Sequence, residues 1–566
     1  MKNKESVSGS VSLLNSLVEE GADTIFGYPG GAIMPVFDAL FDYKHKLKHV
    51  LVRHEQGAVH AAQGYARASG KVGVALVTSG PGATNTITGI ADAMIDSTPL
   101  IVISGQVTSP LLGTDAFQEV DIVGISQPVT KWSYQVRRAD EIAWATAQAF
   151  YIASSGRPGP VLLDFTKDAQ IAMINHHYEK CTSIRSYIPV PKTDRNHLLR
   201  AAELINSAKK PFALIGQGVE IGNAERELID FLEKAQIPAA WTLLGASVLP
   251  FDHPLNKGML GMHGNLAPNQ KTNECDVLVA IGMRFDDRVI GDVNTYAKQA
   301  AIIHFDIDPA EVGKNVDIDV PVLGNVKNTL PAVTSLLKQS EHDDWIESFD
   351  IVNGEEYDKV IADEIYCDRE YISMGEVIRR VSETTGNEAI IVTDVGQNQM
   401  MAARYSKRKF PRSFISSGGL GTMGFGLPAA IGAKIAAPDR TVCLFCGDGG
   451  MQMCIQELGT IMQSNVKVKI IILNNKYLGM VRQWQEMFFN KRYSETPMLN
   501  PDFVKIAEAY RIKGRKVTQR DSLDEAVKEM LDHNGAYLLE VEVEKKGMVL
   551  PMIPAGMNVS NIILEK

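Results

Sequence analysis

Two polar signatures in the last third of the chain could together bind a divalent metal ion. Asp448 follows the run Val442–Cys446, and Asn475 follows the run Val466–Leu473. Both runs are rich in β-branched residues and are typical of buried parallel strands. The carboxyl ends of such strands meet at one edge of a sheet, where a carboxylate and an amide oxygen would suit Mg²⁺ and the oxygens of a diphosphate. Either signature alone is an ordinary turn or helix start, so the metal hypothesis depends on their pairing.

The glycines next to Asp448 would suit a phosphate group. Gly449 and Gly450 have no side chain, so the backbone could approach an anion closely. We expect a helix to follow them and to point its N-terminus at the same anion. The stretch from Thr441 to Asn475 is therefore predicted to be a strand–helix–strand unit that binds a metal-bridged diphosphate.

The same alternation of apolar strands and amphipathic helices fills most of the chain. It predicts an α/β fold with three open, mostly parallel-sheet domains, because one core would be too large for this length. Polar or charged stretches separate the blocks near residues 180–196 and after residue 338. Further strands are expected at 50–52, 212–215, 277–281 and 302–307. The predicted domains are residues 1–180, 190–340 and 370–545, followed by a C-terminal tail at 546–566.

Composition narrows the class of function. The 566 residues carry a formal net charge of −10 without basic clusters, which argues against nucleic acid or an anionic membrane as a partner. The first residues have no apolar segment of signal-peptide length and no apolar run reaches about 18 residues, so a cytoplasmic chain is expected. The six cysteines are scattered, and Cys443 and Cys446 fall inside a predicted buried strand. We expect small buried side chains there rather than a redox or zinc site.

The sequence GDG at 447–449, followed after a helix and a strand by Asn-Asn at 474–475, resembles the signature of thiamine-diphosphate enzymes. The resemblance implies that Asp448, the side chain of Asn475 and the carbonyl oxygen of Tyr477 bind Mg²⁺. The metal would bridge to the diphosphate of the cofactor.

Matches along the chain extend the resemblance to one family, the biosynthetic, flavin-containing acetohydroxyacid synthases. In that family the methionine at position 423 wedges the cofactor into its bent shape, and the C-terminal tail lies over the active site. Asn398 departs from the pattern, because the family often has His there. The other matching cofactor positions are Val395, Gly396, Gln397, Gly421, Gly447, Gly449, Gly450, Leu478, Gly479 and Met480.

Glu55 is the second candidate catalytic residue and stands in RHEQ after the strand expected at 50–52. On its own, a carboxylate at a helix start is favoured by the helix dipole and needs no catalytic role. In the family resembled, this Glu hydrogen-bonds the aminopyrimidine and favours the imino form that removes the thiazolium proton. A buried Glu with a raised pKa suits that task. Because the family holds the diphosphate on another domain, the resemblance implies an active unit of at least a dimer, with the site at the subunit interface.

Three further motifs of the first block match the family in register: YPGGA, GTDAFQE and TKD. Each alone would be a tight turn, a core aromatic with a surface amide, or a solvated charge. Together they resemble the surroundings of the reacting centre and of the first pyruvate. The implied roles are catalytic for Gly31, Gln118 and Lys167, cofactor contact for Tyr28, Pro29 and Gly30, and substrate contact for Phe117.

The middle block resembles the flavin-binding domain of the same family. Its clearest motif is RFDDR at 284–288, directly after the strand expected at 277–281, where an α/β domain binds a dinucleotide. A charged turn would ordinarily be a solvated ion-pair face. The family pattern is altered at 216–218, GQG where GGG is common, and at Asn325, where Asp is usual. The implied flavin contacts are Arg157, Gly216, Gly218, Thr242, Leu243, Leu260, Gly261, Met262, His263, Gly282, Arg284, Asp286, Arg288, Asp306, Ile307 and Asn325.

The resemblance also implies a reaction. Pyruvate would be decarboxylated on thiamine diphosphate, and the hydroxyethyl unit would join a second pyruvate or 2-ketobutyrate. The product would be 2-acetolactate or 2-aceto-2-hydroxybutyrate, in the first common step of branched-chain amino-acid biosynthesis. FAD would have no net redox role, and the expected partners are further copies of the chain, as a dimer or tetramer, and a small regulatory subunit. The residues expected at the substrate are Phe117, Met262, Arg288, Val395, Met480 and Trp484.

Two alternatives stay open at this point. One is another thiamine enzyme on the same scaffold, such as pyruvate oxidase, glyoxylate carboligase or catabolic acetolactate synthase. Pyruvate oxidase would reduce its flavin, glyoxylate carboligase would lack the Glu, and the catabolic enzyme would lack RFDDR. The other is a non-catalytic assembly subunit, which we would expect to have lost Glu55, Asp448 or Asn475. All three residues are present.

Overall fold

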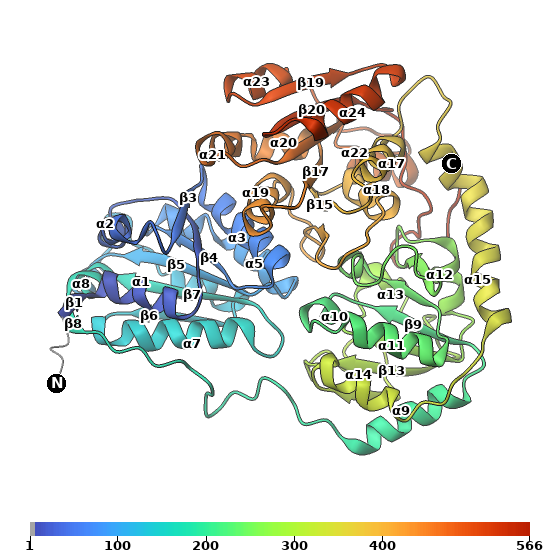
Figure 1. Cartoon of the computed structure of the whole chain (residues 1–566), viewed down its shortest axis with the longest axis horizontal. Coiled ribbons are helices and arrows are strands. Elements are labelled where there is room, and N and C mark those ends of the chain that lie inside the picture. Colours follow the sequence, from blue (N-terminus) through green and yellow to red (C-terminus); the bar gives the residue numbers. More distant parts are fainter. Residues whose placement is uncertain (1–5, 566) are drawn as a thin grey trace.

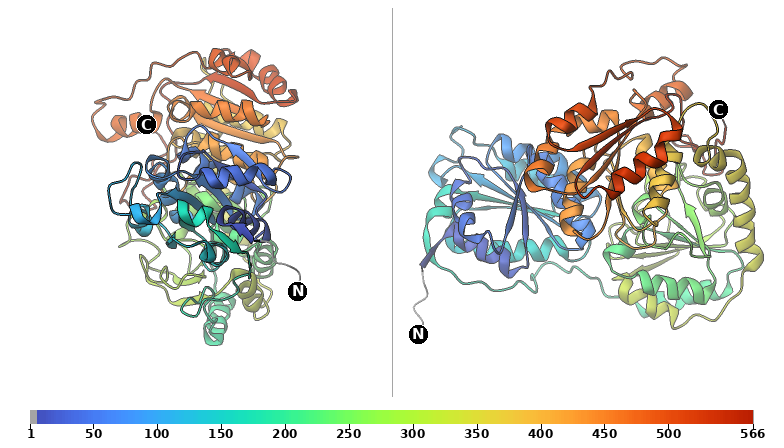
Figure 2. Two further views of the ribbon diagram at one scale, coloured as in Figure 1. Left: turned by 90° about the vertical axis from the view of Figure 1, so that its left-hand side faces the viewer. Right: turned by 45° about the horizontal axis from the view of Figure 1, so that its top comes forward.

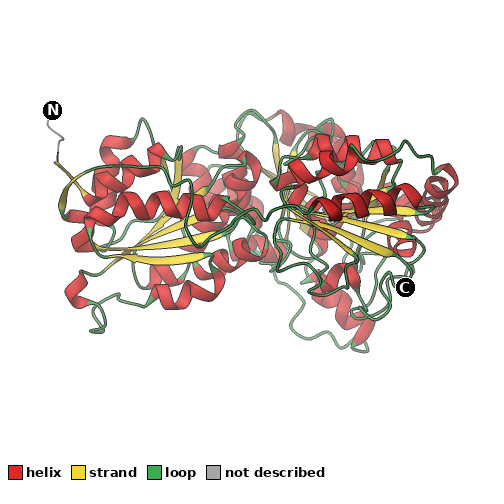
Figure 3. Ribbon diagram, turned by 90° about the horizontal axis from the view of Figure 1, so that it is seen from below, coloured by secondary structure: helices red, strands yellow, loops and turns green. Residues whose placement is uncertain are grey.

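The computed structural model describes residues 6–565 and divides the chain into three α/β domains (Figure 1). Each domain is built on a six-stranded sheet whose neighbouring strands are all parallel. Helices cover both faces of these sheets (Figure 3). The predicted fold class is therefore confirmed. Among the described residues, no helix is both long and apolar enough to cross a membrane.

The sheet of the N-terminal domain has the order β3-β2-β4-β5-β7-β6. Counted within the domain, this is the order 2-1-3-4-6-5. The inner strands are mostly apolar and are buried along their whole length, as a sheet covered on both faces requires. Its elements are β2 (Thr24–Gly27), β3 (Lys48–Leu51), β4 (Gly73–Val77), β5 (Leu100–Gln106), β6 (Trp132–Val136), β7 (Pro160–Thr166), α1 (Gly9–Glu19), α2 (Met34–Tyr43), α3 (Glu55–Ser69), α5 (Ile87–Ile95), α7 (Ile142–Ser154) and α8 (Lys167–Ile171).

The sheet of the middle domain has a different order, β11-β10-β9-β12-β13-β14. Counted within the domain, this is 3-2-1-4-5-6, the order of dinucleotide-binding sheets, in which the ligand crevice opens between strands 1 and 4. Those strands are β9 and β12. The elements are β9 (Pro211–Ile215), β10 (Ala239–Trp241), β11 (Asn256–Met259), β12 (Val277–Ile281), β13 (Ala301–Asp306), β14 (Val320–Leu323), α9 (Arg195–Ser207), α10 (Gly218–Ile221), α11 (Glu225–Ala235), α12 (Leu266–Thr272), α13 (Asp287–Ile290), α14 (Val326–Thr334) and α15 (Asp343–Glu356).

The sheet of the C-terminal domain, β16-β15-β17-β18-β20-β19, repeats the order 2-1-3-4-6-5 of the N-terminal domain. Its elements are β15 (Ile390–Thr393), β16 (Phe414–Ile415), β17 (Val442–Gly447), β18 (Lys469–Asn474), β19 (Lys513–Val517), β20 (Tyr537–Glu542), α17 (Met374–Thr384), α18 (Gln397–Tyr405), α19 (Gly426–Ala436), α20 (Asp448–Met453), η6 (Ile455–Glu457), α21 (Leu458–Ser464), α22 (Gly479–Phe488), α23 (Phe503–Ala509) and α24 (Leu523–Asp532).

The strand–helix–strand unit predicted around Asp448 is present with two differences. Its helix begins at Asp448 itself and breaks at Cys454 into the short η6 and then α21. The second strand begins at Lys469, three residues later than the apolar run starting at Val466 suggests. Val466 is buried before the strand begins, against the core beneath α21. Burial of β-branched residues thus extends beyond the hydrogen-bonded ladder.

The N-terminal and C-terminal domains are joined by a close crossing of α3 and α19 (Figure 1). A Cβ atom on Gly64 would overlap the carbonyl oxygen of Ala429, and one on Gly432 would overlap the carbonyl oxygen of Ala61. The helices can approach this closely because both contact faces consist of small residues. The crossing therefore fixes the two domains against each other.

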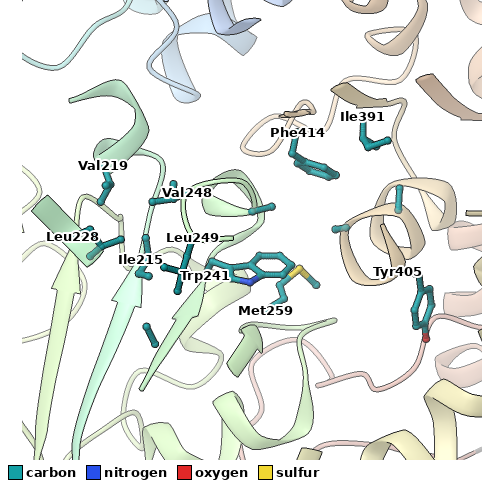
Figure 4. Close-up of a cluster of buried hydrophobic side chains, with 14 of the residues drawn as sticks. Ile215, Val219, Leu228, Trp241, Val248, Leu249, Met259, Ile391, Tyr405 and Phe414 are labelled. Carbon is teal, nitrogen blue, oxygen red and sulfur yellow. The ribbon is translucent and has the colours of Figure 1, made fainter. Parts of the chain in front are cut away.

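The middle and C-terminal domains share one apolar core (Figure 4). In that view Trp241 and Met259 of the middle domain lie between Ile215 on one side and Phe414 and Tyr405 of the C-terminal domain on the other. The connection from the N-terminal domain is different, since residues 176–194 cross to the middle domain as an extended segment (Figures 1 and 2).

Candidate active site

A cavity of about 880 Å³ lies at the junction of the three domains. The N-terminal domain contributes Asp96 and Arg157 to its wall, the middle domain contributes the loops after β9, β12 and β13, and the C-terminal domain contributes Val395 and Trp484. The volume is that of a large cofactor with a substrate beside it.

The middle domain forms its part of the wall at the switch point between β9 and β12. The Gly216 N–H donates to the Ile281 carbonyl oxygen at 2.9 Å, and the Gly218 N–H donates to Gly282 at 2.8 Å. A Cβ on Gly216 would overlap the Gly282 carbonyl oxygen, and Gly282 has a φ of +58°. Only glycine fits such a close approach in this conformation. The result is a bare backbone crevice of the kind that receives a dinucleotide.

Most of the residues that the sequence assigns to flavin line this cavity. Two do not, Gly216 and Gly261, and both pack the loops beneath the wall; a Cβ on Gly261 would lie 2.8 Å from the Arg288 carbonyl oxygen. The lining residues among those predicted are Arg157, Gly218, Thr242, Leu243, Leu260, Met262, His263, Gly282, Arg284, Asp286, Arg288, Asp306, Ile307 and Asn325.

The charged turn after β12 is partly a local ion-pair structure and partly open to the cavity. Asp286 caps α13 by accepting the Arg288 and Val289 N–H groups, and its carboxylate lies 3.9 Å from Arg284. The Arg288 side chain is 60% exposed, pairs with Asp287 at 3.6 Å and donates toward the Met262 sulfur. Its guanidinium can therefore turn to an anionic ligand at low cost.

Arg157 carries a positive charge to the wall, and that charge is already paired. Its guanidinium lies 2.7 Å from Glu311 and 3.3 Å from Asp308, and its Nε donates to Ser97. Arg157 comes from the N-terminal domain and both carboxylates from the middle domain, so the pair also ties the two domains together at the cavity.

The structure brings Asp448 and Asn475 together, as their positions in the sequence predict. Gly447 pairs with Leu473 in the ladder of β17 and β18, so the residues that follow leave the sheet at the same edge. Asp448 is 1% exposed, and its Oδ2 accepts from the Asn500 amide at 2.6 Å. Burial raises the pKa of this carboxyl to about 6. None of the ion pairs among residues 6–565 includes Asp448.

This corner fits a magnesium ion by the chemistry of its oxygen atoms. A buried carboxylate with a neutral partner favours a cation, and among residues 6–565 the Asn475 Oδ1 accepts only the Tyr477 N–H, at 3.0 Å. An amide oxygen has two acceptor sites, so Asn475 keeps one for a metal. Mg²⁺ prefers one or two carboxylates with neutral oxygens. The same corner contains Asn398, whose buried Oδ1 has no partner among the described residues.

Asp394 organises the loops around this corner. Its buried carboxylate accepts N–H groups from Val395, Gly424 and Gly426, and burial raises its pKa. The segment that carries Gly421 and Met423 is thereby held against the loop that carries Val395. The sequence did not predict this role, because Gly424 and Gly426 are 30 and 32 residues away from Asp394 in the chain.

The candidate residues of the N-terminal domain gather at the carboxyl edge of its own sheet. Glu55 is the first residue of α3 and accepts from Asn85 at 2.9 Å. A Cβ on Gly82 would lie 3.3 Å from Glu55 Oε1. Gly80, with a φ of +52°, passes so close to Gln118 that a Cβ there would lie 2.8 Å from its carbonyl oxygen. These residues are not on the wall of the large cavity, and neither are Tyr28, Pro29, Gly30, Gly31, Phe117 or Lys167.

Within one chain, Glu55 and Asp448 lie at opposite ends of the segment formed by α20 and η6. Asp448 begins that segment, and Glu457, at its end, accepts the Arg53 N–H at 3.0 Å, next to Glu55. Glu55 itself is only partly buried in this chain. The burial expected of Glu55 stays a prediction, because the resemblance places this edge at the interface with a second copy of the chain. Phe117 is 87% exposed on the same edge.

Several functional residues were missed by sequence reasoning. Asn500, Glu457, Gln483 and Asp92 all make their contacts across long separations in the chain. Met480 and Trp484, in contrast, were placed correctly on one face of a helix, α22, and both line the cavity.

Comparisons with known proteins agree with this geometry. Three family models of thiamine pyrophosphate enzymes match the chain: the N-terminal TPP binding domain at residues 7–125, the central domain at 198–333 and the C-terminal TPP binding domain at 394–541. The acetolactate synthase isozyme 2 large subunit of Escherichia coli is 44% identical over 99% of this chain and 100% of its own length. The acetolactate synthase large subunit of Lactococcus lactis is 43% identical over 100% of this chain and 97% of its own length. The probable acetolactate synthase large subunit of Methanocaldococcus jannaschii is 44% identical over 98% of this chain and 95% of its own length.

Proposed function

The chain belongs to the acetolactate synthase large-subunit family of thiamine pyrophosphate enzymes, and from this premise we propose that it is the catalytic subunit of an acetohydroxyacid synthase. It decarboxylates pyruvate and joins the two remaining carbons to a second 2-keto acid. Pyruvate as acceptor yields 2-acetolactate, and 2-ketobutyrate yields 2-aceto-2-hydroxybutyrate. The reaction is the first common step of branched-chain amino-acid biosynthesis.

The observation that carries this proposal is the meeting of two sites at one cavity. The loop of Val395 and Gly396 lies on its wall, and the next residue, Gln397, hydrogen-bonds Asn475 of the metal corner. Arg288 and Met262 of the dinucleotide crevice lie on the same wall. A decarboxylating cofactor and a binding site for a second keto acid would thus share one space.

Thiamine diphosphate supplies the electron sink for decarboxylation when it is bound. Asp448, Asn475 and the Tyr477 carbonyl oxygen would hold Mg²⁺, and the metal would hold the diphosphate. The chain's own contribution is orientation. Asp394 fixes the loops of Val395 and Gly424 at the corner through backbone hydrogen bonds.

FAD is the second proposed cofactor, and the middle domain would hold it. The strand order 3-2-1-4-5-6 and the glycine crevice at Gly216, Gly218 and Gly282 support this assignment. The wall residues around the crevice include most of those that resemble the family's flavin contacts.

Glu55 is the proposed activator of the cofactor, acting on the site of a second copy of the chain. Its partial exposure and its position beyond the Glu457 end of the α20–η6 segment support an active dimer. The relatives named above are large subunits, so we also propose a small regulatory partner.

Acetolactate formation from pyruvate by the purified protein tests the proposal. Activity should require thiamine diphosphate and Mg²⁺, and Asp448→Ala should abolish Mg²⁺-dependent binding of thiamine diphosphate in calorimetry. The bound flavin should stay oxidised through anaerobic turnover of pyruvate. Stoichiometric loss of the flavin absorbance would instead assign the protein to the oxidases of this family. No acetolactate with all three cofactors present would reject the proposed reaction.

A further inference from the structure

The C-terminal tail makes a reciprocal pair of hydrogen bonds with Gln483. The Val549 N–H donates to Gln483 Oε1 at 2.9 Å, and Gln483 Nε2 donates to the Val549 carbonyl oxygen at 3.1 Å. Gln483 is fully buried in α22. A backbone unit offers one donor and one acceptor at fixed places, so only one orientation of the Gln483 amide satisfies both.

Gln397 continues this chain of amides. Its Nε2 donates to Gln483 Oε1 at 3.0 Å and to the Gly547 carbonyl oxygen at 2.9 Å. Both partners are acceptors, so the nitrogen of Gln397 must face them and its oxygen must face the other way. That oxygen accepts from Asn475 Nδ2 at 3.2 Å.

The last member of the chain is the predicted metal ligand. Since Gln397 presents an oxygen, the Asn475 amide must turn its nitrogen to Gln397 and its oxygen away, beside the Tyr477 N–H. An amide turned by 180° would present N–H groups to a cation and lose the ligand. Gln397, Gln483 and Asn475 are each at most 4% exposed, so water does not compete for these positions.

We propose that Gln483 and Gln397 are positioning residues that carry the hydrogen-bonding polarity of the Val549 backbone to Asn475, so that the C-terminal tail orients the metal-ligand oxygen. This inference rests on the proposed Mg²⁺ site. Groups that orient metal ligands typically contribute 10- to 100-fold to metal affinity. The tail, which follows the last strand, would then be part of the metal site although it supplies no ligand.

Gln483→Met in the full-length protein tests this chain of amides. Methionine has nearly the same length and no amide, so Gln397 loses one of the two acceptors that fix its orientation and keeps only the Gly547 carbonyl oxygen. Calorimetry of thiamine diphosphate binding across a Mg²⁺ titration should show half-saturation at a Mg²⁺ concentration about tenfold or more above that of the wild type. Flavin content should stay unchanged, whereas the unfolding midpoint without thiamine diphosphate should fall modestly, because the buried Val549 N–H and carbonyl groups lose their partner.

Two further variants distinguish a role of Gln483 in orienting Asn475 from a role in packing alone. Gln485→Met changes the same helix, at a half-buried residue whose amide bonds Ser494 and Thr496 outside the chain of amides. It should leave the Mg²⁺ requirement unchanged. Gln483→Glu keeps the acceptor for Gln397 and for the Val549 N–H, so it should recover most of the affinity that Gln483→Met loses.

The outcomes are distinguishable. Equal Mg²⁺ requirements in wild type and Gln483→Met would overturn the inference while leaving the metal site in place. Equal losses in Gln483→Met and Gln483→Glu, accompanied by loss of flavin, would show a packing role and overturn it as well. Absence of Mg²⁺-dependent binding in the wild type would overturn the proposed cofactor site, and this inference with it.

Discussion

At the scale of single residues, the candidate site uses different residues for proton transfer and for selection of the acceptor substrate. Glu55 lies at the start of α3, where Asn85 is its hydrogen-bonding partner, and a second chain would complete its surroundings. Trp484 lies on the cavity wall beside Phe488, with ring centroids 5.1 Å apart. Glu55 would promote removal of the thiazolium proton, and Trp484 would discriminate between acceptor substrates of different size.

Glu55→Gln should slow exchange of the thiazolium proton of bound thiamine diphosphate by at least about 10²-fold. Glutamine preserves size and the bond to Asn85 but cannot stabilise a protonated pyrimidine. Proton exchange followed by NMR measures this step directly, with flavin content and cofactor affinity as controls for folding. Exchange at the wild-type rate would assign activation to another residue.

Trp484→Leu should lower the ratio of acetohydroxybutyrate to acetolactate by about tenfold when pyruvate and 2-ketobutyrate compete. The two acceptors differ by one methylene, and the indole is a large apolar surface on the wall that could sense it. Product analysis from mixed substrates measures the ratio, and the rate from pyruvate alone should fall much less.

Phe488→Leu is the matched control, since Phe488 packs on Trp484 but is not among the wall residues. It should leave the product ratio nearly constant. If both products fell together in Trp484→Leu, the residue would have a structural role only.

At the scale of helices and strands, the domain arrangement depends on the crossing of α3 and α19. Helices usually pack 8–10 Å apart, and closer approach needs residues without side chains at the contact. Gly64 and Gly432 supply this on the two helices. The crossing sits beside the Asp394 loops, because α19 begins at Gly426, whose N–H is bound by Asp394.

Gly432→Ala should lower the free energy of unfolding by at least about 1–3 kcal/mol, because its Cβ would overlap the backbone of Ala61. Denaturant unfolding followed by circular dichroism measures the change. Gly354→Ala is the control, since Gly354 lies in α15 with no atom within 4 Å of an added Cβ, and it should stabilise by about 0.5–1 kcal/mol. Similar effects of both changes would contradict the close crossing.

Sequence patterns predicted the elements better than the contacts between them. The strand expected at 277–281 is β12 to the residue, because its apolar run ends sharply at a glycine. The pairing of Asp448 with Asn475 followed from sheet topology alone. Asn500 and Gln483 gave no such signal, since each lies in an otherwise ordinary segment and bonds a distant residue, Asp448 and Val549 respectively. Register and periodicity indicate which residues are buried, whereas hydrogen bonds between segments distant in the chain leave no periodic pattern in the sequence.

At the scale of the whole molecule, the carboxylates of Asp92 in α5 and of Asp96 at its C-terminal end connect the N-terminal domain to the C-terminal domain. Asp92 accepts the hydroxyl groups of Ser417 and Thr422, and Asp96 accepts the Gly418 and Gly419 N–H groups. Arg67 lies 3.5 Å from Asp96. The N-terminal domain thereby holds the segment of the C-terminal domain that contributes Gly418 and Gly419 to the cavity wall and leads to Met423.

The folding stability of the Asp96→Asn variant relative to the wild type should increase as pH rises from about 4 to about 6. The pKa of Asp96 is raised from 3.8 to about 6. Burial is the main cause, Arg67 opposes it, and the neighbouring Asp92 adds to the rise. In this window the unfolded chain releases the proton that the folded protein retains, so wild-type stability falls with rising pH. Thermal unfolding midpoints of both proteins across the window measure the difference. A difference that does not change with pH would contradict the raised pKa.

The crossing of α3 and α19 also relates the two outer domains by an approximate two-fold symmetry. Each helix follows the second strand of a sheet with the order 2-1-3-4-6-5, so the two are counterparts. Their contacts are reciprocal, since Gly64 meets Ala429 and Gly432 meets Ala61. The glycine and the alanine are three positions apart on each helix. Such reciprocity is the mark of a two-fold axis between identical subunits. The two outer domains therefore pack as the two halves of a homodimer do, although the middle domain separates them along the chain.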